Sequence, residues 1–145
     1  MAAFEKIHSG LPGLDRALDS IRMGDNVVWQ VSSLSEYAFF LEPFTRTALS
    51  EGRKLIYMRF ADHPPLLQPQ EGLEICHLDP REGFEKFTVA VHEIIARAGR
   101  EAFYVFDSLS ELQVVWSADL MMGNFFVVTC PYLFELDTVA YFRCV

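Results

Sequence analysis

The chain has 145 residues, of which 51% are hydrophobic and 14% aromatic, which is enough apolar material for one packed domain and excludes a disordered chain. Twenty acidic residues outnumber twelve basic ones, and the net charge is -8, so we expect no nucleic-acid partner. No uncharged apolar stretch reaches the length of about 20 residues that a bilayer requires, and no apolar signal segment follows Met1, so we expect no membrane partner and a cytoplasmic location.

Short apolar segments alternate with segments of helical periodicity along the chain. In chain order we predict a strand at Val27–Val31, a helix at Glu36–Ser50, strands at Lys54–Phe60 and Leu73–Leu78, a helix at Glu82–Ala98, a strand at Ala102–Phe106, a helical region within Leu112–Glu135 and a strand at Val139–Val145. The strands are apolar on both faces, as in a sheet covered on both sides. The pattern predicts an α/β domain of three layers, with a mainly parallel five-stranded sheet and helices on both faces.

Two prolines fall inside predicted helices. Proline has no backbone N–H and clashes with the preceding turn, so we expect the last helical region to break near Cys130–Pro131. For the same reason we expect a kink or restart between Phe39 and Pro43. Such a kink would turn Phe39 and Phe40 toward the sheet.

The predicted domain spans residues 1–145 without a linker or an internal repeat. Its last strand is apolar and ends without a polar tail, which would leave an unprotected edge or an unfinished sheet. We therefore expect the chain to be a fragment of a longer polypeptide.

Three segments occur in the order known from one family of nucleotide-binding proteins. They are I-H-S-G-L-P-G-L-D-R-A-L at 7–18, K-L-I-Y-M-R-F-A-D-H at 54–63 and A-F-Y-V-F-D-S-L-S-E-L at 102–112. Together they resemble the RecA-like ATPase family, in particular its KaiC-like branch. The resemblance implies a Walker B-like Asp107 at the carboxyl end of the fourth strand. By analogy with that family we expect the spatial strand order 3-2-4-5-1.

The sequence departs from this family at the positions that bind and hydrolyse nucleotide in active members. A functional phosphate loop reads G-x-x-x-x-G-K-[ST], and the matching octet here is Val31–Ala38. Both glycines are missing, Tyr37 replaces the lysine and Ala38 replaces the hydroxyl residue. At the acidic pair of the second strand, the first position is Ala61 and only Asp62 is acidic. Phosphoryl transfer requires most of these glycine, lysine, hydroxyl and carboxylate groups. We therefore assign no catalytic residue, cofactor or metal to this chain.

The degenerate phosphate-loop region has a second interpretation. It comprises Ser32, Ser33, Ser35, Glu36, Tyr37 and Ala38. Within it, Ser33-Leu-Ser-Glu36 has the form of a capping box, and a helix N-terminus attracts negative charge. One hypothesis is that Glu36 takes the place of a bound anion; the alternative is that it only caps the helix. Both interpretations of Glu36 disfavour nucleotide binding.

Aspartates follow three predicted strands, at Asp62, Asp79 and Asp107. Because the carboxyl ends of parallel strands share one edge, a magnesium site there is one hypothesis. We favour the alternative that each aspartate caps the turn after its strand. His63 follows Asp62 and is interpreted as a hydrogen-bonded structural residue.

Three other short segments of the sequence show a further resemblance. They are G-D-N-V-V-W-Q-V at 24–31, F-A-D-H-P-P-L-L at 60–67 and G-N-F-F-V-V-T-C-P-Y-L at 123–133. They are similar to the amino-terminal segments of phosphoenolpyruvate synthase-like proteins, which are relatives of pyruvate, water dikinase. This implies that a full-length parent is a phosphotransferase whose catalysis belongs to downstream domains.

The favoured function is therefore a non-hydrolysing, degenerate RecA/KaiC-like domain that acts as a regulatory or interaction module. Its implied partners are downstream catalytic domains or further copies of itself. Two alternatives stay open: a divergent nucleotide-binding ATPase or sensor, and a structural oligomerisation module.

Overall fold

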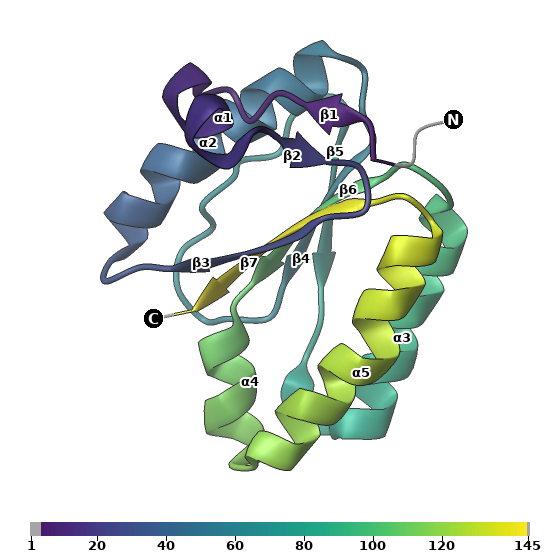
Figure 1. Cartoon of the computed structure of the whole chain (residues 1–145). Helices are drawn as coiled ribbons and strands as arrows, with labels where there is room; N and C mark the ends of the chain where they lie inside the picture. The colour runs from purple at the N-terminus through teal and green to yellow at the C-terminus, as the bar shows by residue number, and fades with distance from the viewer. Residues whose placement is uncertain (1–3, 145) are drawn as a thin grey trace.

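A computed structural model describes residues 4–144, and its central element is a parallel sheet between two helical layers (Figure 1). The strands are β3 (Asn26–Gln30), β4 (Leu55–Arg59), β5 (Leu73–His77), β6 (Phe103–Asp107) and β7 (Val139–Cys144). Their spatial order is β3-β7-β6-β4-β5, with every neighbouring pair parallel. Read from the β5 edge and numbered in chain order, this is 3-2-4-5-1, so the predicted order is confirmed. The last residue of the predicted final strand, Val145, lies outside the described residues.

Helices cover both faces of this sheet (Figure 1). They are α1 (Pro12–Leu18), α2 (Leu34–Ser50), the 3-10 helix η1 (Pro80–Glu82), α3 (Phe84–Ala98), α4 (Leu109–Trp116) and α5 (Asp119–Glu135). Buried side chains of α2 pack on one face, and those of α3, α4 and α5 pack on the other. The predicted three-layer α/β architecture is confirmed.

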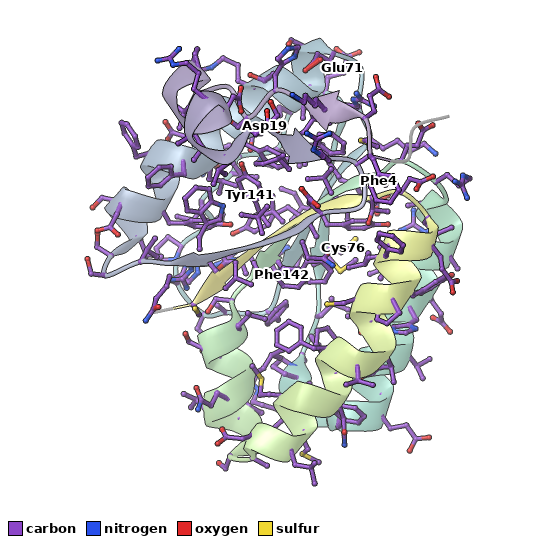
Figure 2. All side chains as sticks on the ribbon, viewed as in Figure 1. Phe4, Asp19, Glu71, Cys76, Tyr141 and Phe142 are labelled. Carbon is purple, nitrogen blue, oxygen red and sulfur yellow. The ribbon has the colours of Figure 1, made fainter. Side chains whose placement is uncertain are left out.

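Strand periodicity divides the sheet residues between two cores. In β6, Phe103 and Val105 join the core beneath α2, whereas Tyr104 and Phe106 join the core beneath α3 and α5. Figure 2 shows the same alternation in β7, where Tyr141 lies on the α2 side and Phe142 on the α5 side. Because both faces are covered, a continuous apolar run rather than an alternating one encodes these strands.

The segment before β3 forms elements that the sequence did not predict. A two-stranded antiparallel sheet pairs β1 (Lys6–Ile7) with β2 (Ile21–Arg22), and α1 lies between these strands in the chain. Ser9, between β1 and α1, is buried, and its backbone N–H donates to Asp15 Oδ1 at 3.2 Å. Ile7 of β1 and Ile21 of β2 are buried in the core beneath α2, so these short strands cover one side of that core.

The predicted break at Cys130–Pro131 is wrong. The helical region divides instead at Ser117, a left-handed residue with φ of 52°, whose N–H donates to the carbonyl of Gln113 and ends α4. Pro131 lies inside the continuous helix α5. It is tolerated because it is exposed and the carbonyl left without an N–H partner belongs to Val127, whose side chain is 70% exposed, so water can reach that turn. Among residues 4–144, no helix combines the length and apolar character needed to cross a bilayer.

Pro43 also lies inside one continuous helix, so the predicted restart in α2 does not occur. Phe40 stacks on Trp29 of β3 with ring centroids 4.3 Å apart. The prediction that Phe39 also turns toward the sheet is wrong, since its side chain is 64% exposed. Gly10 lies directly against the backbone at Pro43: an added Cβ would be 2.3 Å from the Pro43 carbonyl oxygen.

We expect Gly10→Ala to destabilise the fold more than Gly52→Ala. Both glycines have positive φ, 87° and 73°, so alanine is strained at either position by about 1–2 kcal/mol. Only at Gly10 does the added methyl group also clash with backbone, which adds about 1–3 kcal/mol. Urea unfolding of the two variants measures the difference. Equal losses would show that the close contact between the N-terminal segment and α2 contributes nothing.

The edge strand β5 is tied to α3 by an ion pair whose effect on stability depends on pH. Arg97 donates two hydrogen bonds to Glu74, at 2.8 and 2.7 Å, and these bonds lower the pKa of Glu74 to about 2. A lowered carboxyl pKa contributes stability above the ordinary value of 4.5, and that stability is lost as the pH falls toward 2. We therefore expect the difference in Tm between the parent and Glu74→Gln to shrink across this window. A difference that stays constant would contradict the assignment.

Candidate functional site

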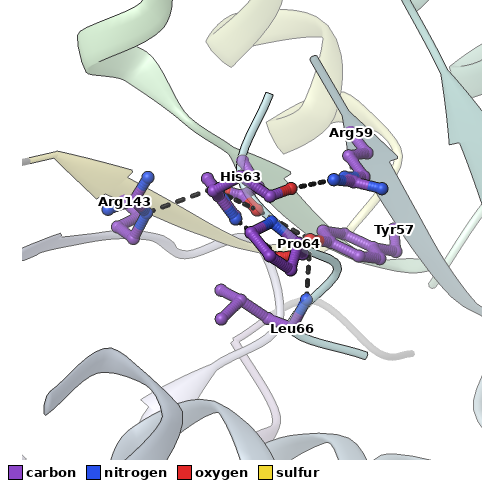
Figure 3. A network of polar contacts seen from close by, with 7 residues as sticks. Tyr57, Arg59, His63, Pro64, Leu66 and Arg143 are labelled. Atoms are coloured by element: carbon purple, nitrogen blue, oxygen red, sulfur yellow. Dashed lines mark hydrogen bonds and ion pairs between the residues drawn. The ribbon is translucent and has the colours of Figure 1, made fainter. Parts of the chain in front are cut away.

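Asp107 forms the centre of a buried polar network at the carboxyl end of β6. Its side chain is fully buried. The Tyr57 hydroxyl donates to Oδ2 at 2.6 Å and Arg143 Nε donates to Oδ1 at 3.1 Å. His63 Nε2 lies 2.9 Å from the same carboxylate. Figure 3 shows Tyr57, His63 and Arg143 converging from β4, the loop after β4 and β7.

The register of the sheet brings these residues together. Phe106 pairs with Phe142, so Asp107 and Arg143 occupy the next positions of adjacent parallel strands. Asp107 pairs with Arg59 on its other side, and Tyr57 lies two residues earlier on the same face of β4. The carboxylate therefore has a donor from each neighbouring strand. Tyr57 belongs to the core beneath α2, and strand alternation places Asp107 and Arg143 on the same face of the sheet.

The network neutralises a charge that burial would otherwise make unfavourable. Arg143 is only 5% exposed and faces the carboxylate directly, as a buried ion requires. Burial, and then the neighbouring Asp107 carboxylate, raises the pKa of Tyr57 well above its usual value, so the phenol stays a hydrogen-bond donor.

The loop after β4 is held against this network. The second ring nitrogen of His63, Nδ1, lies 2.8 Å from the Pro64 carbonyl oxygen. Both ring nitrogens thus lie within hydrogen-bonding distance of an oxygen atom. Leu66 N donates to the Tyr57 hydroxyl at 3.4 Å, and Arg59 donates to the His63 carbonyl oxygen. His63 is hydrogen-bonded, as interpreted from the sequence, and it fastens the proline-rich loop to the sheet.

Tyr37, at the position of the missing lysine, points into the core. It is fully buried, and its hydroxyl has no hydrogen-bond partner among the described residues. Burial, and then the Asp107 carboxylate, raises the pKa of Tyr37 well above its usual value. Tyr37 is therefore a neutral core side chain. The next residue, Ala38, is half-buried.

The serines of the degenerate phosphate-loop region cap α2. Ser33 is the N-cap, and its Oγ accepts from the Glu36 N–H at 3.1 Å. Glu36 does not complete the predicted capping box: its carboxylate accepts from the Ser32 hydroxyl at 2.9 Å. Ser35 Oγ lies 3.1 Å from Ser33 Oγ. All four side chains are exposed, and no residue from Ser32 to Tyr37 has positive φ, so the backbone lacks the left-handed residues of a phosphate nest.

The other predicted carboxylates do not join Asp107. Asp62 is exposed and lines a surface pocket of about 230 Å³ together with Asp79 and Arg81. Asp79 caps η1 by accepting from the Arg81 N–H at 2.9 Å, as predicted. For Asp107 the turn-cap prediction is wrong, because its carboxylate belongs to the buried network. Among residues 4–144, no three His, Cys, Asp or Glu side chains are grouped to hold a metal ion.

The three cysteines are free, partly buried thiols, and Cys76 and Cys144 pack against the core beneath α3 and α5. Burial and the hydrogen bond to Glu74 raise the pKa of Cys76 to about 11, and burial raises the pKa of Cys130. A raised pKa keeps a thiol protonated and a weak nucleophile. Neither residue is therefore an activated nucleophile.

In comparisons with known proteins, no family model and no curated protein matches this chain. The resemblance to RecA/KaiC-like domains therefore rests on the segments quoted above and on the strand order. The resemblance to phosphoenolpyruvate synthase-like proteins rests on its three quoted segments alone.

Sequence reasoning missed Tyr57 and Arg143 as partners of Asp107. Arg143 carried a usable signal, since it is the only charged residue in the apolar segment 139–145. A lone charge inside a buried strand requires a buried counter-charge. Tyr57 carried no such signal, because tyrosine is common in strands.

We expect Arg143→Met to destabilise the protein by about 3–5 kcal/mol, because it leaves the Asp107 carboxylate buried without its cation. Asp107→Asn removes the opposite charge. The double variant should lose less stability than the sum of the two single losses, because it leaves no unpaired charge. Urea unfolding of the four proteins measures this coupling. Additive losses would show that the two charges do not stabilise each other.

Proposed function

We propose that this chain is a non-hydrolysing, degenerate RecA/KaiC-like domain that acts as a regulatory or interaction module. The observation that carries the proposal is the engagement of Asp107. In a phosphate-loop ATPase the Walker B aspartate helps to hold Mg²⁺. Here both oxygens of that carboxylate accept hydrogen bonds from the protein, and the side chain has no exposed surface.

The start of α2 supports the same proposal. A bound triphosphate needs converging backbone N–H groups and a cation. The Ser33 side chain already accepts the N–H of Glu36, and the Glu36 carboxylate adds negative charge in the first turn. The lysine position is filled by the buried ring of Tyr37. The region that would hold a nucleotide is thus occupied by a helix cap and by core packing.

The proposal extends to the setting of the domain. If the similarity to phosphoenolpyruvate synthase-like proteins reflects the full-length parent, phosphoryl transfer belongs to domains downstream of this one. The contribution of this chain is then to contact those domains or further copies of itself. Its α/β fold would act as a scaffold for such contacts.

We expect isothermal titration with Mg-ATP to give no saturable heat. Asp107→Asn should leave that result unchanged while lowering the free energy of unfolding, because the carboxylate has a structural role. Chelation of magnesium by EDTA serves as the control for heats that arise from the metal alone. Saturable binding of Mg-ATP in the micromolar range, lost in Asp107→Asn, would refute the proposal and favour a nucleotide sensor.

A further inference from the structure

One edge of the sheet, formed by β3, is open for pairing. Within residues 4–144, β3 pairs only with β7 (Figure 1). The bonds to β7 fall on odd-numbered residues, since Ala140 N donates to the Asp25 carbonyl and Val31 N donates to the Cys144 carbonyl. In a parallel ladder such bonds alternate along the strand. The backbone N–H and C=O groups of Asn26, Val28 and Gln30 therefore point away from the sheet.

This edge lacks the features that usually protect an edge strand. Proteins discourage pairing with charged side chains, proline or bulges, but β3 reads N-V-V-W-Q and contains none of these residues. Its pairing with β7 runs without a bulge from Asn26 to Gln30. The opposite edge strand, β5, carries Glu74, which Arg97 pairs. In a chain of net charge -8, the uncharged strand β3 adds no local charge repulsion between two copies that meet there.

Exposed apolar side chains lie on both sides of β3. Val28 is 55% exposed, although its partner in the register, Phe142, is buried against Phe126 of α5. Near the carboxyl end of the strand, the exposed ring of Phe39 contacts Phe40, which stacks on Trp29 of β3.

At the near end of β3, Phe134 is 52% exposed. It lies beside Gly24, just before the strand, and 6.1 Å from the ring of Phe4. Aromatic side chains are enriched at protein interfaces. The exposed rings of Phe39 and Phe134 therefore favour a protein contact at this edge.

We propose that β3 pairs antiparallel with β3 of a second copy, about a twofold axis at Val28. In this register Val28 lies opposite Val28 of the other copy, and Asn26 lies opposite Gln30. Each outward-pointing residue then exchanges backbone hydrogen bonds with its counterpart. Val27 and Trp29, whose backbone groups bond to β7, form the intervening pairs without hydrogen bonds. The result is one continuous sheet of ten strands.

The strand favours a second copy over a foreign segment because this register is self-complementary. A twofold interface places the same patch of both subunits together, and here it sets apolar Val28 against itself and one carboxamide side chain against another. No like charges oppose each other, which would otherwise weaken a cross-strand pair. This inference names a partner for the interaction module and rests on that proposed function.

The expected dimer is weak. Two five-residue strands alone cover less than the roughly 800 Å² per partner of a standard interface, so the neighbouring aromatic side chains must contribute area. We therefore expect association in the micromolar range.

Sedimentation velocity over about 1–200 µM protein tests the pairing, because dimer content rises with concentration. The mass should approach twice 16.6 kDa. Val28→Lys should shift it to that of a monomer, because two lysines would then oppose each other at the axis. The matched control is Val89→Lys on α3, where Val89 is 51% exposed, and it should remain dimeric. A monomeric parent at every concentration, or a dimer that survives Val28→Lys, would overturn the inference.

A pair of double variants tests the register itself. Asn26→Lys with Gln30→Glu places opposite charges across the axis and should preserve the dimer. Asn26→Lys with Gln30→Lys places like charges there and should dissociate it. Far-UV circular dichroism checks that each variant is folded. If both double variants behave alike, the register is wrong. None of these outcomes depends on the Mg-ATP titration, so the proposed function is tested separately.

Discussion

The buried carboxylate of Asp107 is the constraint around which the carboxyl edge of the sheet is arranged. An isolated buried charge is strongly unfavourable, so it must be paired and hydrogen-bonded. β6 is the central strand, and its two neighbours each supply a donor, Tyr57 from β4 and Arg143 from β7. The loop after β4 supplies the third through His63. One charge therefore explains both a buried arginine and the docking of a proline-rich loop.

The same arrangement decides what the domain can do. A nucleotide site in this kind of fold needs an open space between the start of the first helix and the aspartate of the central strand. Here the ring of Tyr37 is fully buried in the core beneath α2. The phenol ring cannot replace lysine as a partner for phosphate, but it adds apolar surface to the core beneath α2. In this chain Asp107 and Tyr37 are buried and contribute to the packed interior.

Local sequence patterns predicted what depends on local physics. Apolar runs identified the five strands, because a strand covered on both faces must be apolar throughout. They also placed Asp107 at the end of β6. The network around it was not predictable, since its donors lie 50, 44 and 36 residues away along the chain. The effect of the prolines was misjudged for a related reason. Whether a helix tolerates Pro43 or Pro131 depends on solvent and neighbouring segments, which the local sequence does not reveal.

The open edge strand β3 is joined through β7 to the polar network around Asp107. Trp29 of β3 is the register partner of Arg143, and Arg143 holds Asp107. An added strand on β3 would restrict the fluctuations of β3 and, through its ladder of hydrogen bonds, those of the arginine beside the carboxylate. Edge strands with one unpaired side belong to the parts of a fold that open most readily. Under the proposed pairing, association of two copies would therefore also stabilise the buried network around Asp107.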